Sequence, residues 1–285
     1  MTEYTGYVIT FHCSDRLGVM ARFASLFYES GAFITSTAQY SDSVTQRFFQ
    51  RCVFDDRCLK ISYEQFCQAL DRLAAEMQMD YQLRPLKQRM KLLLGVSRFD
   101  HCINNLLNKW KAGVLPVDIV GVFSNHEDCR RLVEWHDIPY HHLPITPDTK
   151  PEQESRIMAL MNEHKVELLV LARYMQVLSD SMSQQLAGRA INIHHSFLPG
   201  FKGAKPYHQA YDRGVKIIGA TAHYVTSDLD EGPIIAQEVK AVDHNLSADD
   251  MVLLGHDIES STLTHAVKLH AQQRVILNGQ RTVIL

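Results

Sequence analysis

The sequence predicts an α/β protein of two domains, a small βαββαβ unit over residues 1–85 and a doubly wound, mostly parallel sheet over residues 86–285. The 285 residues are enough for one large domain or two ordinary ones. In the first part, short strand-like segments alternate with two amphipathic helices. From about Lys91, continuous apolar runs alternate with helical segments, as is typical of parallel strands buried on both faces. This change in pattern, after Pro85, marks the boundary between the domains.

The first domain is expected to begin with a strand over residues 4–11, which is rich in Tyr, Val, Ile and Thr. A helix follows, with an apolar stripe at i, i+4, i+7 and i+8, and Gly31 ends it as a C-terminal cap. The stripe consists of Val19, Phe23, Leu26 and Phe27. Further strands are expected over 33–40 and 47–54, then a second helix and a short strand ending near Pro85. The apolar residues of the second helix are Phe66, Leu70, Leu73 and Met77.

The second domain is expected to alternate strands and helices before a later antiparallel pair. Its strands are predicted over 91–96, 117–123, 168–172 and 191–194, with helices near 102–112, 127–136 and 151–164. Residues 217–225 and 234–242 predict the antiparallel pair, and a long helix over 247–273 follows. The tail is expected to form a hairpin with Asn278 and Gly279 at its turn.

Composition excludes several classes of protein. The net charge of −3 argues against a protein that binds the phosphate backbone of nucleic acids. No apolar run approaches the roughly 20 residues of a membrane span, and no signal peptide is evident, so we expect a cytoplasmic protein. The six cysteines form no C-x-x-C pair and indicate reduced thiols. Fifteen histidines raise the question of a metal, but no zinc-ligand spacing is present, so no metal is expected.

Asn192, His194 and His195, at the end of one apolar strand, are the first candidates for a reaction centre. Asn192 and His194 alternate with Ile191 and Ile193, so both polar side chains leave one face of the strand. An amide donor and an imidazole could polarise a carbonyl oxygen as negative charge develops on it. Equally, both side chains could satisfy backbone groups at a strand end.

Asp230 is the candidate carboxylate for this centre. It lies in an acidic turn between two predicted strands, and such a turn can bring a carboxylate back toward the neighbouring strands. Taken alone, an aspartate in a turn is more often a surface residue than a catalyst. His195, His141 and His142 have no assigned role.

Three ordered motifs carry a resemblance to a known family. Residues 191–199 (INIHHSFLP), 219–225 (GATAHYV) and 228–235 (DLDEGPII) resemble the formyltransferase-fold family that uses 10-formyltetrahydrofolate. The resemblance implies a formyltransferase-fold catalytic domain over residues 86–285, in which Asn192, His194 and Asp230 match the catalytic Asn, His and Asp. It also implies two walls of a folate pocket. These walls consist of Arg173, Tyr174, Met175, Gln176, Val177 and Leu178 on one side, and Thr226, Ser227, Asp228 and Leu229 on the other.

The first 85 residues resemble an ACT domain, a small ferredoxin-like regulatory module that often binds amino acids. The residues that carry this resemblance are 15–18 (DRLG) and 29–34 (ESGAFI), although the usual module has proline where Leu17 stands. It implies a small amino-acid effector that acts through the linker at 84–91. Because a lone sheet of this kind often pairs with a second copy, we expect a homo-oligomer, a dimer or tetramer, joined through residues 1–85.

The ACT-like front, the formyltransferase-type domain and His-His rather than His-Pro in the first motif are together similar to the formyltetrahydrofolate deformylase family. This similarity implies direct attack of water on 10-formyltetrahydrofolate, which releases formate for purine synthesis and tetrahydrofolate and balances the one-carbon pools. The folate is the substrate, and no cofactor is expected. Asn192 would donate to the formyl oxygen, His194 would stabilise the oxyanion and protonate the leaving nitrogen, and Asp230 would hold the water and keep His194 charged.

Three alternative functions share features with this sequence. A glycinamide ribonucleotide formyltransferase needs a glycine-rich phosphate cradle after its first strand, but residues 95–102 hold one glycine, and Asp100 would repel a phosphate. A transfer-RNA formyltransferase would need an extra nucleic-acid domain at the C-terminus. An ACT-type sensor that binds folate without turnover stays open, although the complete set of Asn192, His194 and Asp230 argues against it.

Overall fold

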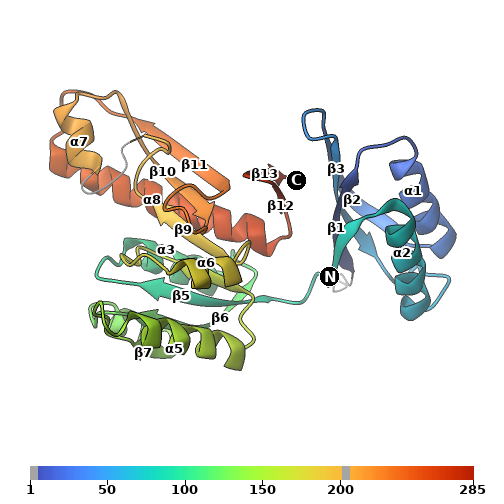
Figure 1. Cartoon of the computed structure of the whole chain (residues 1–285), viewed down its shortest axis with the longest axis horizontal. Helices are drawn as coiled ribbons and strands as arrows, with labels where there is room; N and C mark the ends of the chain where they lie inside the picture. The colour runs from blue at the N-terminus through green and yellow to red at the C-terminus, as the bar shows by residue number, and fades with distance from the viewer. Residues whose placement is uncertain (1–5, 201–205) are drawn as a thin grey trace. The chain divides into compact units, whose positions relative to one another are not determined.

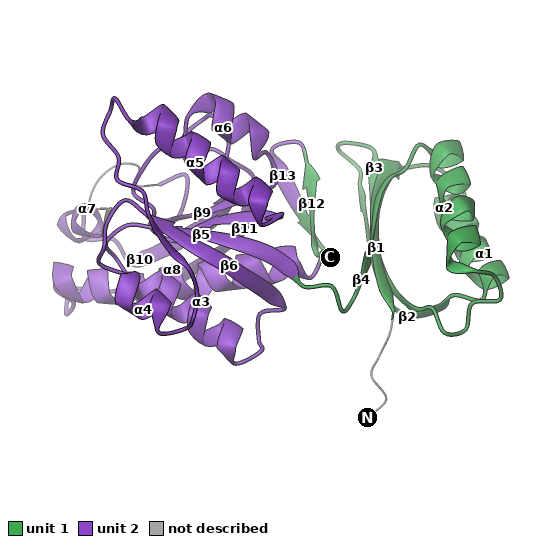
Figure 2. Cartoon of the chain, turned by 90° about the horizontal axis from the view of Figure 1, so that it is seen from below, with its two compact units in different colours: residues 1–89, 273–278, 283–285 green, residues 90–272, 279–282 purple. Residues whose placement is uncertain are grey.

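The structure is a computed structural model, and it describes residues 6–200 and 206–285 (Figure 1). Residues 4 and 5 of the first predicted strand therefore lie outside the described residues. The chain divides into two compact units (Figure 2). The first comprises residues 1–89, 273–278 and 283–285, and the second comprises residues 90–272 and 279–282.

The first unit is a four-stranded antiparallel sheet with two helices, as the βαββαβ prediction requires. Its elements are β1 (Tyr7–Ser14), α1 (Val19–Ser30), β2 (Phe33–Asp42), β3 (Arg47–Asp55), α2 (Tyr63–Met77) and β4 (Asp80–Pro85), with the strands in the order β2-β3-β1-β4. The predicted stripe packs into the core, where Phe27 meets the rings of Phe54 and Phe66. Gly31 ends α1 at a φ of 76°, the left-handed conformation expected of such a cap.

The C-terminal tail forms the predicted hairpin, but much of it belongs to the first unit rather than to the second. Its strands are β12 (Val275–Asn278) and β13 (Arg281–Ile284). Phe48 and Phe49 point to opposite faces of the sheet: Phe48 packs in the core under the helices, and Phe49 packs with tail residues. These tail residues are Ile276, Val283 and Leu285. The apolar face that the two helices leave open explains why the tail packs there.

The second unit is a seven-stranded sheet with helices on both faces, α5 and α6 on one and α3 and α8 on the other (Figure 2). The doubly wound prediction is therefore confirmed. The elements are β5 (Met90–Val96), α3 (His101–Lys111), β6 (Val117–Ser124), α4 (Arg130–Glu134), β7 (Tyr140–His142), α5 (Lys150–Glu163), β8 (Leu168–Leu171), α6 (Asp180–Gln185), β9 (Ala190–His194), α7 (Pro206–Asp212), β10 (Ile217–Tyr224), β11 (Ile234–Ala241) and α8 (Ala248–Ala271).

Strand order places the candidate residues near one another. The order is β11-β10-β9-β8-β5-β6-β7, parallel from β9 to β7, while β10 and β11 form the predicted antiparallel pair. The loops that follow the parallel strands β5, β8 and β9 leave the same edge of the sheet. These loops carry residues 97–100, 172–179 and 195–205, of which 201–205 are not described. Among the described residues, no helix is both long enough and apolar enough to cross a membrane.

Candidate active site

Asn192 and His194 project from one face of β9, as their alternation with isoleucines predicts. Antiparallel pairing sets His223 of β10 opposite Asn192, and Thr221 opposite His194. Paired residues on neighbouring strands share a face, so His223 joins Asn192 and His194 on that face. His194 and His223 are both almost fully buried, and Asn192 is half-buried.

Asp230 reaches both histidines from the turn between β10 and β11. Its Oδ2 lies 3.1 Å from Nδ1 of His194, and its Oδ1 lies 3.6 Å from Nε2 of His223. Burial alone would raise the pKa of Asp230. Hydrogen bonds and Coulomb attraction from His194 and His223 outweigh burial and hold that pKa well below its usual range. Asp230 is therefore an anion at neutral pH.

The Asp230 backbone adopts a φ of 58°, the left-handed region that non-glycine residues seldom occupy. Gly232, two residues further on, has no room for a Cβ, which would stand 1.7 Å from the carbonyl oxygen of Tyr224. Together these features hold the turn tightly and aim the carboxylate at the histidines. Backbone strain of this kind clusters at functional sites.

The hydrogen-bond partners of His194 determine which of its nitrogens is available. The carboxylate of Asp230 can only accept, so Nδ1 of His194 carries a proton and donates it. Its Nε2 is buried, with no hydrogen-bond partner among the described residues. A buried polar atom without a partner is costly in a protein and calls for an explanation such as an absent ligand. His194 therefore offers one free nitrogen for chemistry.

His223 is a residue of the site that the sequence analysis left without a role. Its Nδ1 lies 2.9 Å from the carbonyl oxygen of Tyr224, so Nδ1 donates there. That leaves Nε2 facing the amide of Asn192 at 3.5 Å and the carboxylate of Asp230 at 3.6 Å. The motif 219–225 contained this histidine, but only the strand register shows that it lies opposite Asn192.

The first predicted wall of the folate pocket, residues 173–178, has a buried part and an exposed part. Tyr174 and Leu178 belong to the apolar core, and the hydroxyl of Tyr174 donates to Gln153. Met175 and Val177 are each about half exposed. The backbone nitrogen of Met175 donates to Oγ of Ser97, which ties this segment to the loop after β5. Any contact with a bound molecule would therefore come from Met175 and Val177, while Tyr174 and Leu178 hold the segment in place.

The second predicted wall, residues 226–229, is the start of the turn that ends at Asp230. Oγ1 of Thr226 donates to the carbonyl oxygen of Asp228, which stabilises the turn. Leu229 exposes 61% of its surface. An exposed leucine beside a catalytic candidate is available to contact an apolar ring.

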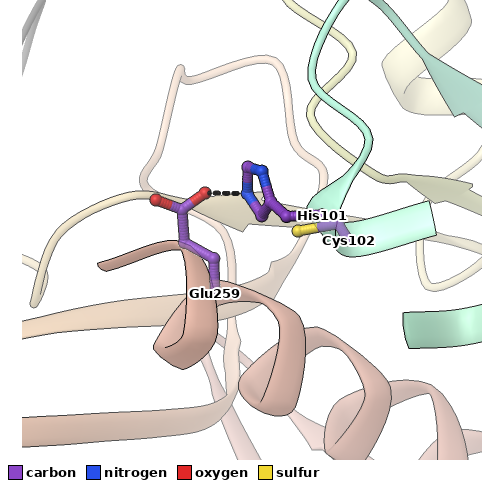
Figure 3. Close-up of side chains that lie close together, drawn as sticks. All are labelled: His101, Cys102 and Glu259. Carbon is purple, nitrogen blue, oxygen red and sulfur yellow. Dashed lines mark hydrogen bonds and ion pairs between the residues drawn. The ribbon is translucent and has the colours of Figure 1, made fainter. Parts of the chain in front are cut away.

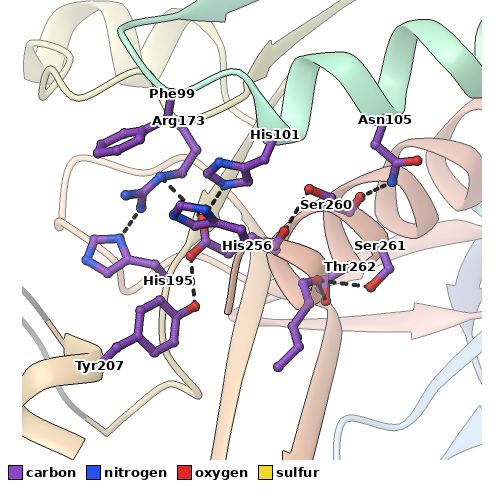
Figure 4. Close-up of polar contacts among 12 residues, drawn as sticks. Phe99, His101, Asn105, Arg173, His195, Tyr207, His256, Ser260, Ser261 and Thr262 are labelled. Carbon is purple, nitrogen blue, oxygen red and sulfur yellow. Dashed lines mark hydrogen bonds and ion pairs between the residues drawn. The ribbon is translucent and has the colours of Figure 1, made fainter. Parts of the chain in front are cut away.

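A buried ionic network lies where α3, α7 and α8 meet the loops that follow β8 and β9 (Figure 4). At its centre is Glu259 of α8, which is fully buried. Oε2 of Glu259 lies 2.9 Å from Nε2 of His101 and 3.2 Å from Nε of Arg173, and Tyr207 donates to Oε1 at 2.8 Å. Arg173 in turn donates from Nη1 to Nδ1 of His195. None of the residues in this network except Arg173 was a predicted site residue.

Part of this network resembles a metal site in composition. Donor atoms of His101, Cys102 and Glu259 lie within 4.8 Å of one another (Figure 3). Burial raises the pKa of the Cys102 thiol, so the thiolate that a metal would need is disfavoured. The guanidinium of Arg173, 3.2 Å from Glu259, already compensates the carboxylate and would repel a cation. The trio is better explained as part of the ionic network.

Comparison with known proteins gives the family. The formyl transferase family model matches residues 90–267. A formyltetrahydrofolate deformylase from Corynebacterium sp. (strain P-1) is 47% identical over all of both chains. The crystal structure of a deformylase from Pseudomonas syringae pv. tomato has a TM-score of 0.96 and 39% identity, and the match covers 100% of this chain and 96% of that one.

The rival formyltransferases match only part of the chain. A phosphoribosylglycinamide formyltransferase from Anaplasma phagocytophilum has a TM-score of 0.64 and 29% identity, and the match covers 69% of this chain and 95% of that one. The deformylases instead match the first unit as well as the second. The chain therefore belongs to the formyltetrahydrofolate deformylase family.

Proposed function

We propose that Asn192, His194 and Asp230 hydrolyse 10-formyltetrahydrofolate to formate and tetrahydrofolate, the reaction of the family to which the chain belongs. The observation that carries the proposal is the unpartnered Nε2 of His194, buried beside the anionic Asp230 and on the same face as Asn192. An amide donor, a free imidazole nitrogen and a carboxylate thus converge at one place. These groups can supply the oxyanion stabilisation and the proton transfers by which hydrolysis of a formamide is catalysed.

The reaction proceeds by direct addition of water. The water oxygen attacks the formyl carbon, and Asp230 accepts its proton. Asn192 and the Nε2–H of protonated His194 donate to the oxygen of the tetrahedral intermediate. The carbon–N10 bond then breaks as N10 takes a proton from His194. Formic acid and tetrahydrofolate leave, and the acid releases its proton to solvent as formate. The proton that Asp230 took from water also passes to solvent, and the vacant Nε2 of His194 takes up a proton from solvent while Nδ1 keeps its own, so that atoms and charge balance.

Substrate would lie between the two predicted walls. Met175 and Val177 on one segment and Leu229 on the other present exposed apolar side chains, which suit the flat pterin ring. The rest of each segment would position these side chains through its own hydrogen bonds. In this proposal the folate is the substrate, and no metal or further cofactor takes part.

The decisive experiment measures formate released from 10-formyltetrahydrofolate with no added acceptor and with a chelator present. We expect wild-type protein to release formate stoichiometrically with tetrahydrofolate, at a rate that EDTA does not change. A protein that binds the folate without turnover would be a sensor. Activity that EDTA abolishes and a divalent ion restores would contradict the metal-free mechanism.

The first unit would act as a regulatory module and as the site of assembly. Strand β2 is an edge of its sheet and is exposed along most of its length. Phe33 and Tyr40 on this strand expose 62% and 46% of their surface. An edge strand that carries exposed aromatic side chains is suited to pair with a second copy. The candidate effector, a small amino acid, would bind near residues 15–18 and act through the linker.

Light scattering of the full chain tests the assembly. We expect at least a dimer for the wild type, and dissociation when Phe33→Asp places a charge on the β2 edge. Tyr28→Asp, at a still more exposed aromatic position on α1, is the control and should keep the assembly. A monomeric wild type, or a Phe33→Asp variant that stays assembled, would show that β2 does not build the oligomer.

A further inference from the structure

The two neighbouring histidines of the first motif stack on one another. The rings of His194 and His195 lie 5.1 Å apart, with planes inclined by 18°. The proposed reaction needs one imidazole that takes up and gives back a proton. Two stacked imidazoles could compete for that proton, and two positive charges at this distance would repel. The site therefore needs a feature that assigns the proton to one ring.

Arg173 provides this feature through the direction of its hydrogen bond. Nη1 of Arg173 contacts Nδ1 of His195. A guanidinium only donates and keeps its charge at all ordinary pH values, so Nδ1 of His195 must accept. The proton of the neutral ring is then on Nε2. Burial, followed by the positive charges of Arg173 and His194, lowers the pKa of His195 to about 4.

The guanidinium is held in place on several sides. Its Nε lies 3.2 Å from Glu259, and its charge centre stands 5.2 Å from the ring of Phe99. The Arg173 backbone has a φ of 65°, an unusual conformation for a buried arginine. Glu259 is fixed by its hydrogen bonds with His101 (Figure 3) and Tyr207. Each group in the network therefore limits the movement of the next.

The charged and titratable groups that face His195 come from five parts of the chain. Arg173 follows β8, Glu259 lies on α8, His194 is on β9, Asp230 is in the turn after β10, and the ring of Tyr207 on α7 lies 6.4 Å away. Glu259 and Asp230 favour a proton on His195, but each is already paired, Glu259 with Arg173 and Asp230 with His194. Asp230 therefore stabilises a proton on His194 directly, at 3.1 Å.

We propose that the Arg173–Glu259 ion pair is a positioning device that holds His195 neutral with its proton on Nε2, so that His194 alone carries the proton of the reaction. The inference rests on the proposed role of His194. Arg173 and Glu259 act through His195, and His195 presents an uncharged ring to its stacked neighbour. This arrangement gives His195, which had no role in the sequence analysis, a definite one.

Nitrogen-15 NMR of the full-length protein with labelled histidines tests the state of His195 without substrate. Comparison with His195→Gln assigns its signals. We expect a neutral ring with the proton on Nε2 from pH 8 down to pH 5.5. A His195 that titrates near 6.5, or that carries its proton on Nδ1, would overturn the proposal. The state of His195 is read from the wild-type spectra, and the variant serves only to assign the signals.

A double variant, Arg173→Gln with Glu259→Gln, tests the link to catalysis. Both charges are removed together because the loss of one alone would leave a buried charge unpaired. We expect the pKa of His195 to rise but to stay below its ordinary value, because burial, the largest cause of its shift, remains. The fall in kcat between pH 8 and pH 5.5 should be at least about twofold larger than in wild type. Glu134→Gln, which breaks an exposed ion pair with Arg130, is the control and should match wild type.

Rates are measured at saturating substrate, so that they report kcat alone. A change in KM, which could arise because Arg173 belongs to a predicted pocket wall, then does not affect the result. A double-variant profile that runs parallel to the wild-type profile, only lower, would show a merely structural role and overturn the proposal. If wild-type protein releases no formate, the proposed function fails, and the spectra still decide the state of His195.

Discussion

Asp230 is the residue on which the proposed chemistry depends most, because it is the only carboxylate that contacts His194 among the described residues. Its carboxylate also faces His223, so a single side chain orients two imidazoles. The turn geometry that aims it is strained, and the anionic state is favoured by the histidines themselves. Loss of its charge should therefore affect catalysis more than folding.

We predict that His194→Ala and Asp230→Asn each reduce formate release by at least about 10², since each removes an acid–base or electrostatic contribution to the transition state. Folate binding, measured by calorimetry, should change little because the proposed pocket walls are untouched. Ser181→Ala, at an exposed position of α6, serves as the control. Near-wild-type turnover in either variant would remove that residue from the mechanism.

His195 should also make stability depend on pH. Its pKa is about 4 in the folded protein and about 6.5 in an unfolded chain, so the unfolded chain binds the proton first as pH falls. The contribution of neutral His195 to the free energy of unfolding is fully present above pH 6.5 and is lost progressively down to pH 4. By pH 5 the loss is roughly 2 kcal/mol.

Urea unfolding of wild type and His195→Gln at pH 8 and pH 5 measures this contribution. The free energy of unfolding should fall by roughly 2 kcal/mol less in the variant than in wild type when the pH is lowered from 8 to 5. An equal loss in both proteins would mean that His195 is not held neutral by the folded state.

Single residues could be placed from the sequence where polar and apolar side chains alternate along a strand. Asn192 and His194 share a face because they are two positions apart, and the structure brings Asp230 to them. Their catalytic roles stay predictions. Glu259 could not be found in this way, because it meets His101 across 158 positions and only the packing of α8 against α3 joins them. His223 was likewise hidden until the antiparallel register was known.

At the scale of elements, helix α8 carries much of the organisation of the second unit. It packs against α3, α7 and the strands β9, β10 and β11, and it brings Glu259 to the network. Ser247 caps its N-terminus in a reciprocal arrangement with Asp250. Gly255 lies where α7 approaches most closely: a Cβ there would stand 2.2 Å from the ring of Tyr207.

We predict that Gly255→Ala destabilises the protein by about 1–3 kcal/mol through overpacking, although alanine favours a helix by about 1 kcal/mol over glycine. The displaced ring of Tyr207 would also lose its hydrogen bond to Glu259. Thermal unfolding measures the effect, with Leu253→Ala at an exposed position of the same helix as control. A variant as stable as wild type would show that α7 moves aside without cost.

Element prediction failed where a pattern was too short to detect. The three residues of β7 cannot show alternation, and they become a strand only by parallel pairing with β6. The six residues of α6 are too few for a periodic stripe, although Ser179 caps that helix. The longer elements, such as the α1 stripe with its Gly31 cap, were confirmed because their signals are repeated over several turns.

At the scale of the whole molecule, the first unit is assembled from both ends of the sequence. Asn278 in the tail is buried and donates to Oδ2 of Asp42 at 2.7 Å. Hydrogen bonds from the backbone of Val44 and the side chain of Thr45, with a smaller part from Asn278, lower the pKa of Asp42 to about 2. The sequence predicts that the tail belongs to the second domain, which is wrong for much of it. Chain order does not show which exposed apolar face a hairpin will cover.

We predict that Asn278→Ala lowers the melting temperature by about 2–5 °C, because it removes a hydrogen bond to a buried carboxylate. Formate release at 25 °C should stay near wild type, since Asn278 belongs to the first unit and the residues of the proposed mechanism belong to the second. Differential scanning calorimetry measures the shift. Gln280→Ala, at an exposed turn position of the same hairpin, is the control, and equal melting temperatures for both variants would assign no stabilising role to Asn278.

The place of the tail in the first unit has a consequence for biosynthesis. Residues 1–89 leave the ribosome early. The face of the sheet that carries Phe49 is covered only after Ile276, Val283 and Leu285 have been synthesised. At about 5–20 residues per second, the nearly 200 intervening residues take roughly 10–40 s to synthesise. During that interval the nascent sheet carries an open apolar face, which is the kind of surface that chaperones bind. Translation speed through the second unit would therefore set how long the first remains unfinished.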